Sequence, residues 1–209
     1  MKLVLATHNR DKVSEILHIL SDLDVDVADL DAFPGAPETV EDGDTLEANA
    51  LKKAREILEF TSCSALADDT GLEVDALDGA PGVYSSRFAG ENAGYERNCD
   101  KLLRDLGSVE RSRRAARFRT VIALALTPAD AEVAGAEVLV AEGILPGEIT
   151  EERRGEGGFG YDPIFFDPEA GKTLAEMSAD EKNSRSHRYR ALVEMRELML
   201  RINLLHEAQ

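Results

Sequence analysis

The sequence predicts an α/β fold, because apolar strands and amphipathic helices follow one another along it. One observation is the start of the chain, where a short apolar run is followed at once by apolar residues at helical spacing. Another is a helical segment that leads into an apolar stretch ending in two adjacent aspartates, Asp68 and Asp69. With 209 residues, the chain can bury a substantial core as one domain, or as one domain with two lobes.

The first part of the chain supplies two strands and two helices. Residues 2–6 are predicted to form a buried strand and residues 11–20 a helix, whose apolar positions are Val13, Ile16, Leu17 and Leu20. A second helix is predicted from residue 44 to about residue 60, because Asp44 and Glu47 have the spacing of a capping box. Its candidate inner positions are Leu46, Ala50, Ala54, Ile57 and Leu58. Residues 64–67 then form a short strand that ends in the paired acids before a glycine turn.

The rest of the chain contains two long strands and a long final helix. The pattern predicts a turn over residues 79–82, a helix over 92–106, and strands over 117–126 and 137–145 joined by an irregular link that begins at 127–130. The final helix carries one apolar stripe, which is typical of a core or a subunit interface: Ala191, Leu192, Met195, Leu198, Met199, Ile202 and Leu205.

Composition argues against several partners. The 24 Lys and Arg residues against 41 Asp and Glu give a net charge of −17, which repels nucleic acid and anionic membrane surfaces. Cys63 and Cys99 lie far apart without metal-binding spacing, so we expect two buried free thiols in a reducing compartment. The apolar run over residues 3–6 is far shorter than a signal-peptide core or a membrane span, so the expected location is the cytoplasm.

Polar residues fill the turn between the first strand and the first helix: Thr7, His8, Asn9, Arg10, Asp11 and Lys12. A helix N-terminus presents free N–H groups and the positive end of the helix dipole, so Arg10 and Lys12 can complete a phosphate-binding turn there. The alternative is a plain N-cap by Asn9 with solvated charges.

Asp68 and Asp69, with Glu41 from the acidic run before the second helix, are the candidate metal ligands. Mg²⁺ takes carboxylate and phosphate oxygens and keeps several waters, so one or two carboxylates suffice. A water held by the metal or activated by a carboxylate can then attack phosphorus. The alternative is a solvated acidic turn, which the apolar strand before the pair disfavours.

The glycine-rich segment over residues 155–163 is a candidate site for a purine ring. Its glycines, Gly160 among them, let a ligand approach the backbone closely. Phe159 and Tyr161 offer aromatic faces, and Asp162 can accept hydrogen bonds from a ring or an amine. A purely structural turn is the alternative.

Lys182, His187 and Arg188 gather hydrogen-bond donors at the predicted start of the last helix. Cations gain nothing from the dipole at that end of a helix, so an anionic or keto-bearing ligand explains them better than helix stability does. Lys53 and Arg87 are further cations that can join such a pocket. The alternative is a basic patch on an acidic surface.

Five segments together resemble the inosine triphosphate pyrophosphatase family, whose bacterial members are called dITP/XTP pyrophosphatases. In chain order they read LATHNRDK, EDGDTLEANALKKA, ALADDTGLEVDALDGAPGVYSSRFAG, GGFGYDPIFF and EKNSRSHRYRAL. The resemblance implies a long twisted mixed sheet flanked by helices, two lobes with a central cleft, and a homodimer. It also implies Mg²⁺-dependent hydrolysis of dITP, ITP and XTP between the α and β phosphates, which cleanses the nucleotide pool.

The same resemblance implies a role for each candidate residue. Asp69 matches the general base and metal ligand of the family, and Glu41 a second metal contact. Residues 7–12 match the triphosphate-binding turn, in which His8 stands where many members have glycine, and Thr70 matches the adjoining substrate contact. Residues 159–162 match the segment that holds base and sugar. The C-terminal substrate contacts are matched by Lys182, His187 and Arg188, and the family pattern favours Lys53 over Lys52 as the lysine facing the site.

Two other functions compete with this one. The first is a related house-cleaning pyrophosphatase for modified pyrimidine or 7-methylguanine triphosphates. The second is a nucleotide-binding module that does not hydrolyse its ligand, which the intact pair of aspartates argues against.

Overall fold

The structure is a computed structural model that describes residues 1–21 and 23–207, with the side chains of all of these except 11 and 202–207. The chain forms two compact units. Unit 1 comprises Met1–Asp69, Thr120–Gly143 and Tyr189–Gln209, and unit 2 comprises Thr70–Arg119 and Ile144–Arg188. Each unit has its own apolar core. The α/β class is confirmed, and the two units correspond to the two predicted lobes.

The described part of the chain contains one mixed sheet of eight strands. Their order is β2-β1-β3-β5-β6-β7-β8, and β4 pairs with β3 off this path. Strand β1 (Lys2–Leu5) is parallel to both β2 (Asp26–Ala28) and β3 (Ser64–Val74), whereas the pairs formed by β4 and by β7 are antiparallel. The long strands β3, β5 (Ala115–Ala125) and β6 (Val138–Ile149) contribute residues to both units.

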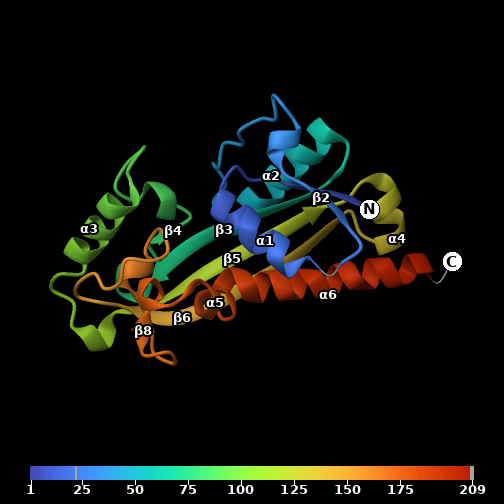
Figure 1. The fold of residues 1–209 in the computed structure, drawn as a ribbon. Helices are drawn as coiled ribbons and strands as arrows, with labels where there is room; N and C mark the ends of the chain where they lie inside the picture. Colours follow the sequence, from blue (N-terminus) through green and yellow to red (C-terminus); the bar gives the residue numbers. More distant parts are fainter. Residues whose placement is uncertain (22, 208–209) are drawn as a thin grey trace. The chain divides into compact units, whose positions relative to one another are not determined.

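Unit 1 packs helices on both sides of its strands. Its helices are α1 (Arg10–Ile19), α2 (Leu46–Thr61), the short α4 (Pro128–Ala134), and nearly all of α6 (His187–Glu207) (Figure 1). Its loop 29–45 includes a single 3₁₀ turn, Leu30–Ala32. None of the described helices combines the length and apolar character that a membrane crossing needs.

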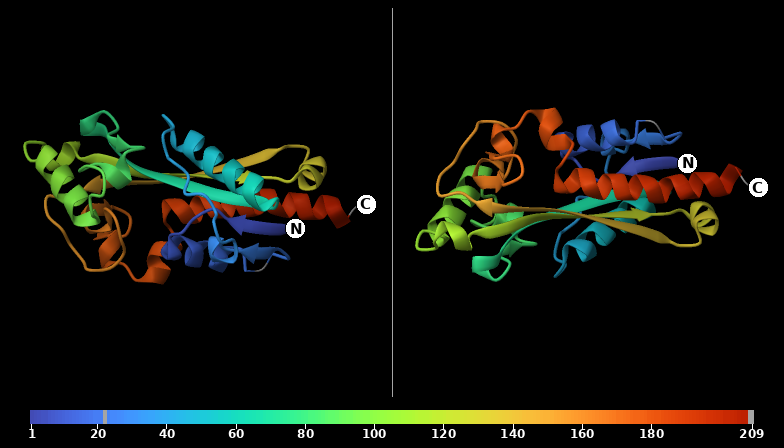
Figure 2. Two further views of the ribbon diagram at one scale, coloured as in Figure 1. Left: turned by 90° about the horizontal axis from the view of Figure 1, so that it is seen from above. Right: turned by 90° about the horizontal axis from the view of Figure 1, so that it is seen from below.

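The two faces of these strands carry side chains of different size. Successive residues of a strand point to opposite faces, so Leu66 and Leu124 pack into the core with α1 and α6, while the equally buried Ala65 and Ala67 point the other way. Both views of Figure 2 place α2 on the opposite side of β3 and β5 from α6. Small residues on that side let α2 pack closely against the sheet, and this brings its polar side chains within reach of β3.

The predicted strand over 64–67 is too short. Strand β3 continues through both aspartates and the glycine to Val74, so the acids lie inside a strand rather than before a turn. Its neighbour β1 ends opposite Leu66, but pairing continues further on, where Leu72 lies opposite Gly82 of β4. Asp68 and Asp69 therefore lie just beyond the end of β1, which keeps this part of the sheet accessible to side chains from the helices.

Two predictions about helix starts are wrong. Helix α2 is capped by Thr45, whose side chain accepts a hydrogen bond from Ala48 N, and not by Asp44. The predicted irregular link at 127–130 is the start of α4, where Thr127 is the N-cap. Asp130 then accepts hydrogen bonds from Thr127 and from Ser64 of β3, which joins the helix to the sheet.

Unit 2 is built from short elements around the ends of the long strands. It contains β4 (Pro81–Gly82), β7 (Phe165–Asp167), β8 (Lys172–Thr173), α3 (Tyr95–Asp105) and α5 (Ala179–Asn183). Five 3₁₀ turns connect them: Asp75–Leu77, Ser85–Arg87, Arg111–Arg113, Asp162–Ile164 and Leu174–Glu176. The core packs Leu102 of α3 against Leu145, Ile149 and Phe165. The predicted turn over 79–82 is therefore partly strand, and the predicted strand over 137–145 extends to Ile149.

The prediction of one final helix starting near residue 181 is also wrong. Helix α5 ends at Asn183 and α6 begins at His187, with three residues between them. Lys182 thus lies in the last turn of α5, where a cation is favoured by the dipole. The apolar stripe of α6 is buried as expected at Ala191, Leu192, Met195 and Met199, while the side chains of Ile202 and Leu205 lie outside those described. Cys99 is buried, but Cys63 is only half-buried.

Candidate active site

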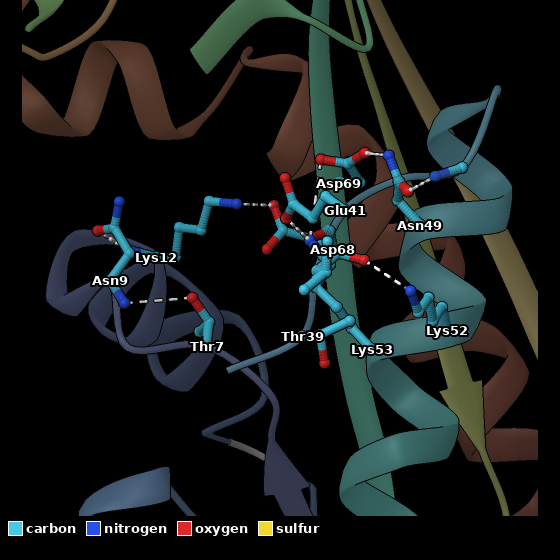
Figure 3. A network of polar contacts seen from close by, with 12 residues as sticks. Thr7, Asn9, Lys12, Thr39, Glu41, Asn49, Lys52, Lys53, Asp68 and Asp69 are labelled. Carbon is cyan, nitrogen blue, oxygen red and sulfur yellow. Dashed lines mark hydrogen bonds and ion pairs between the residues drawn. The ribbon is translucent and has the colours of Figure 1, made fainter. Parts of the chain in front are cut away.

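The turn before α1 has both of the features that its sequence predicts as alternatives, an N-cap and a cation directed at the site. Asn9 accepts a hydrogen bond from Lys12 N at 3.3 Å and donates its own N–H to Thr7 Oγ1 at 3.2 Å, so it acts as an N-cap. His8 and Arg10 are exposed, and the side chain of Asp11 lies outside those described. Lys12 points toward β3, where its Nζ lies 3.0 Å from Asp68 Oδ2 (Figure 3). The cap and a cation aimed at the acids therefore coexist.

The two neighbouring aspartates of β3 are contacted by different helices. Asp68 points to the same face of β3 as Leu66 and pairs with Lys12 of α1. Asp69 points to the same face as Ala67 and accepts a hydrogen bond from Asn49 Nδ2 of α2 at 3.0 Å. Both acids are buried, with 2% and 7% of their surface exposed. The alternation of side chains along a strand thus assigns each carboxylate its own partner.

Lys53 of α2 contacts Glu41 and both aspartates of β3. Its Nζ lies 2.6 Å from Glu41 Oε1 and 3.8 Å from Asp69 Oδ1, and it donates to the Asp68 carbonyl oxygen at 2.5 Å. Lys52 instead pairs with the exposed Asp42 at 2.6 Å and donates to the Val40 carbonyl oxygen. Burial opposes ionisation of Lys53, but the charges of Asp69, Asp68 and Glu41 outweigh it and raise the pKa of the ammonium. Lys53, not Lys52, therefore lies beside the acids and stays charged.

The environment of Asp69 suits a base. Burial raises the pKa of its carboxyl group and the neighbouring charge of Glu41 adds to this, while Lys53, Asn49 and Lys12 act in the opposite direction. A carboxylate whose pKa is raised above its ordinary value accepts a proton from water more readily than an ordinary aspartate does.

Asn49 is a site residue that the sequence interpretation missed. Its side chain is fully buried, and its Oδ1 accepts a hydrogen bond from Gly43 N at 2.8 Å while its amide holds Asp69. A Cβ at position 43 would lie 2.7 Å from that Oδ1 and would have to displace it, so a glycine here keeps the Asn49 amide in place. The sequence does contain a pattern that indicates this residue. Asn49 and Lys53 are four residues apart on the inner face of α2, where polar residues are unexpected.

The acidic cluster fits a divalent cation by the chemistry of its donors. Asp68, Asp69 and Glu41 offer three hard carboxylates against the two ammonium groups of Lys12 and Lys53, which leaves negative charge over. Among the described side chains, no three carboxylate, imidazole or thiol groups gather closely enough to hold a cation by themselves. A bound Mg²⁺ would therefore complete its shell with phosphate oxygens and water, as it commonly does.

In unit 2, Asp162 is the centre of a second polar group. It is 3% exposed, and its Oδ2 accepts hydrogen bonds from Lys182 Nζ at 2.7 Å and from Phe159 N at 2.9 Å. Burial raises the pKa of Asp162, and the charge of Lys182 counteracts this. Gly158 is required here, because it has φ +71° and any Cβ would collide with the Asp162 carboxylate.

Cations surround the half-buried ring of Phe159. Lys182 Nζ lies 4.3 Å from the ring centroid and the Arg188 guanidinium 5.8 Å from it. His187 stacks on Phe118 with a centroid distance of 4.6 Å. Lys182, His187 and Arg188 are all buried. They are thus not a solvated basic patch, and the cations Lys182 and Arg188 lie at the ring of Phe159, whose backbone N–H donates to Asp162.

The other predicted residues of unit 2 differ in their placement. Tyr161 is 5% exposed and donates its hydroxyl to the Ser85 carbonyl oxygen, so its ring belongs to the core rather than offering a free face. Gly160 has φ +64°, which explains the glycine at that position. Thr70 follows Asp69 on β3 and is half-buried, and the guanidinium of Arg87 lies over the ring of Tyr84.

Comparisons with known proteins cover almost the whole chain. The sequence pattern of the Ham1 family matches residues 3–198. A dITP/XTP pyrophosphatase from Desulforamulus reducens is 49% identical over 99% of this chain and 100% of the relative, and one from Geobacter sulfurreducens is 50% identical over 91% and 92%. Among solved structures, a HAM1 protein from Coxiella burnetii superimposes with a TM-score of 0.87 at 40% identity, covering 96% of this chain and 98% of that one. Both the sequence and the fold therefore place this chain in the Ham1 family.

Proposed function

We propose that this protein hydrolyses non-canonical purine nucleoside triphosphates, namely dITP, ITP and XTP, to the monophosphate and pyrophosphate, and so cleanses the nucleotide pool. The observation that carries the proposal is the grouping of Asp69, Glu41 and Lys53, with Lys12 and Asp68 beside them. The names of the nearly full-length relatives support the same activity.

In this proposal Asp69 orients and deprotonates the attacking water. Lys12, Arg10 and the N–H groups at the start of α1 bind the phosphates, with Thr7, His8, Asn9 and Asp11 in the same turn and Thr70 next to Asp69. These positive groups stabilise the charge that moves toward the leaving pyrophosphate, and such electrostatic stabilisation usually contributes most to the catalysis of phosphoryl transfer. Asp69, Glu41 and Asp68 would hold Mg²⁺, which when bound polarises the phosphates and lowers the pKa of a bound water.

The second polar group is proposed to select the base. Phe159, Gly160, Tyr161 and Asp162 form the base and sugar segment, and Lys182, His187 and Arg188 supply donors, with Arg87 as a further cation. Hypoxanthine and xanthine carry a 6-keto acceptor where adenine carries a 6-amino donor. A cationic donor is satisfied by the first and left unpaired by the second.

The deciding experiment is an assay of ITP, dITP and XTP against ATP and GTP, with and without Mg²⁺, in which phosphate and pyrophosphate are measured separately. The proposal expects pyrophosphate only, with Mg²⁺ required and the non-canonical bases preferred. Preference for a modified pyrimidine or 7-methylguanine triphosphate would favour the related house-cleaning enzyme. Calorimetric binding of ITP without any product would favour a module that binds without hydrolysis.

Arg188→Ala is expected to reduce kcat/KM for ITP more than for ATP. An unmade bond to a buried polar partner costs about 1–3 kcal/mol, so the ITP/ATP preference should fall by roughly 5- to 150-fold. Steady-state kinetics on both substrates measures this ratio. Arg190→Ala, an exposed arginine on the same helix, is the matched control and should leave the ratio unchanged. Equal losses on ITP and ATP would remove Arg188 from base recognition.

We further propose that the chain acts as one domain over residues 1–209, in the cytoplasm and as a homodimer, with neither nucleic acid nor membrane as a partner. The net charge of −17 supports the last point. The dimer follows from the resemblance to the pyrophosphatase family, and analytical ultracentrifugation of the purified chain tests it.

A further inference from the structure

An exposed tyrosine lies beside the aromatic ring proposed to hold the base. The rings of Tyr95 and Phe159 have centroids 6.2 Å apart and are tilted by 43°. Tyr95 is 52% exposed, although it is one of only eleven Phe and Tyr residues in a chain without tryptophan. A large aromatic ring left this open at the margin of a polar site is a surface that a planar ligand can cover.

Tyr95 is held in this place by contacts of the residues that follow it in α3. It is the first residue of α3, and Arg153 donates to the Glu96 carbonyl oxygen at 2.6 Å and to Asp100 at 2.7 Å. One turn further on, the buried Cys99 thiol donates to the Gly160 carbonyl oxygen at 3.3 Å. Burial raises the pKa of Cys99 to about 11, so the thiol keeps the proton that this bond needs. The first turns of α3 are thereby joined to the glycine-rich segment that carries Phe159.

Phe159 alone offers little apolar surface to a base. It is itself half-buried, and the ammonium of Lys182 and the guanidinium of Arg188 lie at its ring. No cation lies over the ring of Tyr95 in the described part of the chain. The exposed aromatic area of this pair is therefore provided mainly by Tyr95.

We propose that Tyr95 is a second aromatic contact for the purine ring, which together with Phe159 sets the affinity for the base. This inference rests on the proposed function of the Asp162 group as the base site. It assigns Tyr95 to binding and not to chemistry, because the tyrosine contacts Phe159 of the proposed base site. Its loss should therefore act on substrate binding and leave the chemical step intact.

Steady-state kinetics of Tyr95→Ala on ITP gives the first test. KM should rise by about fivefold or more, the lower end of what a lost stacking face costs, while kcat changes less than twofold. Tyr95→Phe keeps the ring and should stay within about twofold of the unmodified protein in KM, which separates stacking from any effect of the hydroxyl. Phe60→Ala removes an equally open ring from α2 in unit 1 and is the matched control. An unchanged KM in Tyr95→Ala, with ITP still hydrolysed, would overturn the inference and leave the proposed function standing.

A direct binding readout does not depend on turnover or on how well the alanine variant folds. Because the chain has no tryptophan, Tyr95→Trp introduces a single indole at this position. Stacking of hypoxanthine should quench its fluorescence saturably when inosine monophosphate is added, whereas ribose 5-phosphate and tripolyphosphate, which lack a base, should not. If the indole fluorescence does not change when inosine monophosphate is added, in a variant that still hydrolyses ITP, the base does not reach position 95. If the unmodified protein hydrolyses no triphosphate, the proposed function fails by itself, and quenching by inosine monophosphate would still report a base site here.

Discussion

Asp69→Asn is expected to lower the turnover of ITP by at least about 10²-fold, the typical contribution of a general base before any loss of metal is counted. The reason is geometric as well as chemical. Asn49 and Lys53 hold the Asp69 carboxylate from α2, and an amide of the same shape keeps that position without the ability to accept a proton. Single-turnover and steady-state assays with pyrophosphate detection measure the effect. Near-normal turnover would mean that another group activates the water.

The same variant is expected to gain stability at neutral pH. Burial raises the pKa of Asp69, so the ionised carboxylate is less favourable in the folded chain than in the unfolded one. The unmodified protein therefore loses stability as the pH rises through that raised pKa, and the asparagine variant does not. Thermal unfolding should show a higher Tm for the variant at pH 7 and a gap that closes as the pH falls toward about 3.9, the ordinary value for aspartate. A lower Tm at pH 7 would show that the charge stabilises the fold.

Asp44→Asn is the matched control for both measurements. Asp44 is an exposed acid in the run before α2, and Thr45 rather than Asp44 caps that helix. Removing its charge should change neither turnover nor the pH dependence of stability. A loss of activity in this control would indicate a general effect of charge and not a specific role of Asp69.

Local patterns in the sequence predicted the elements of the site well. The apolar positions of α2 recur every three to four residues, and the polar turn stands directly at the start of α1. Each of these two patterns is contained in a short stretch of sequence, so it does not depend on tertiary contacts. The family resemblance then identified Asp69, Asp162 and Lys182, and the structure brings Asp162 and Lys182 into contact. The predicted metal and substrate roles of these residues stay predictions.

What local patterns did not predict are the features that tertiary contacts determine, such as the length of a strand or the end of a helix. The length of β3 depends on partners that start elsewhere in the chain, so the local pattern around the glycine after the aspartates predicts a turn where the strand continues. Spacing alone leaves Lys52 and Lys53 open, because it does not show how α2 is rotated against the sheet, whereas the family pattern favours Lys53, the lysine that lies beside the acids in the structure. The break between α5 and α6 has neither proline nor glycine to mark it. Local propensity yields to packing in each of these cases.

Lys182→Met is expected to destabilise the fold by about 3–5 kcal/mol, because it leaves the carboxylate of Asp162 buried without its counter-ion. The side chains of the pair are only 9% and 4% exposed, and their charged atoms lie 2.7 Å apart. Urea unfolding with a conformational probe measures the loss. The double variant Lys182→Met/Asp162→Asn should recover much of it, since no unpaired charge then remains, and the double-mutant cycle isolates the pair.

The pH dependence of this loss distinguishes a buried charge from lost packing. Burial raises the pKa of Asp162 and Lys182 counteracts it, so removing the lysine raises that pKa further. The folded variant then binds more protons than the unfolded chain, and its stability must fall as the pH rises. Lys172→Met breaks a pair with Glu181 in the same unit whose side chains are 44% and 43% exposed, and it should change stability little at any pH. A deficit of Lys182→Met that stays constant between about pH 5 and about pH 8, a range above the ordinary carboxyl pKa of about 3.9, would mean that the methylene groups of Lys182 matter and its charge does not.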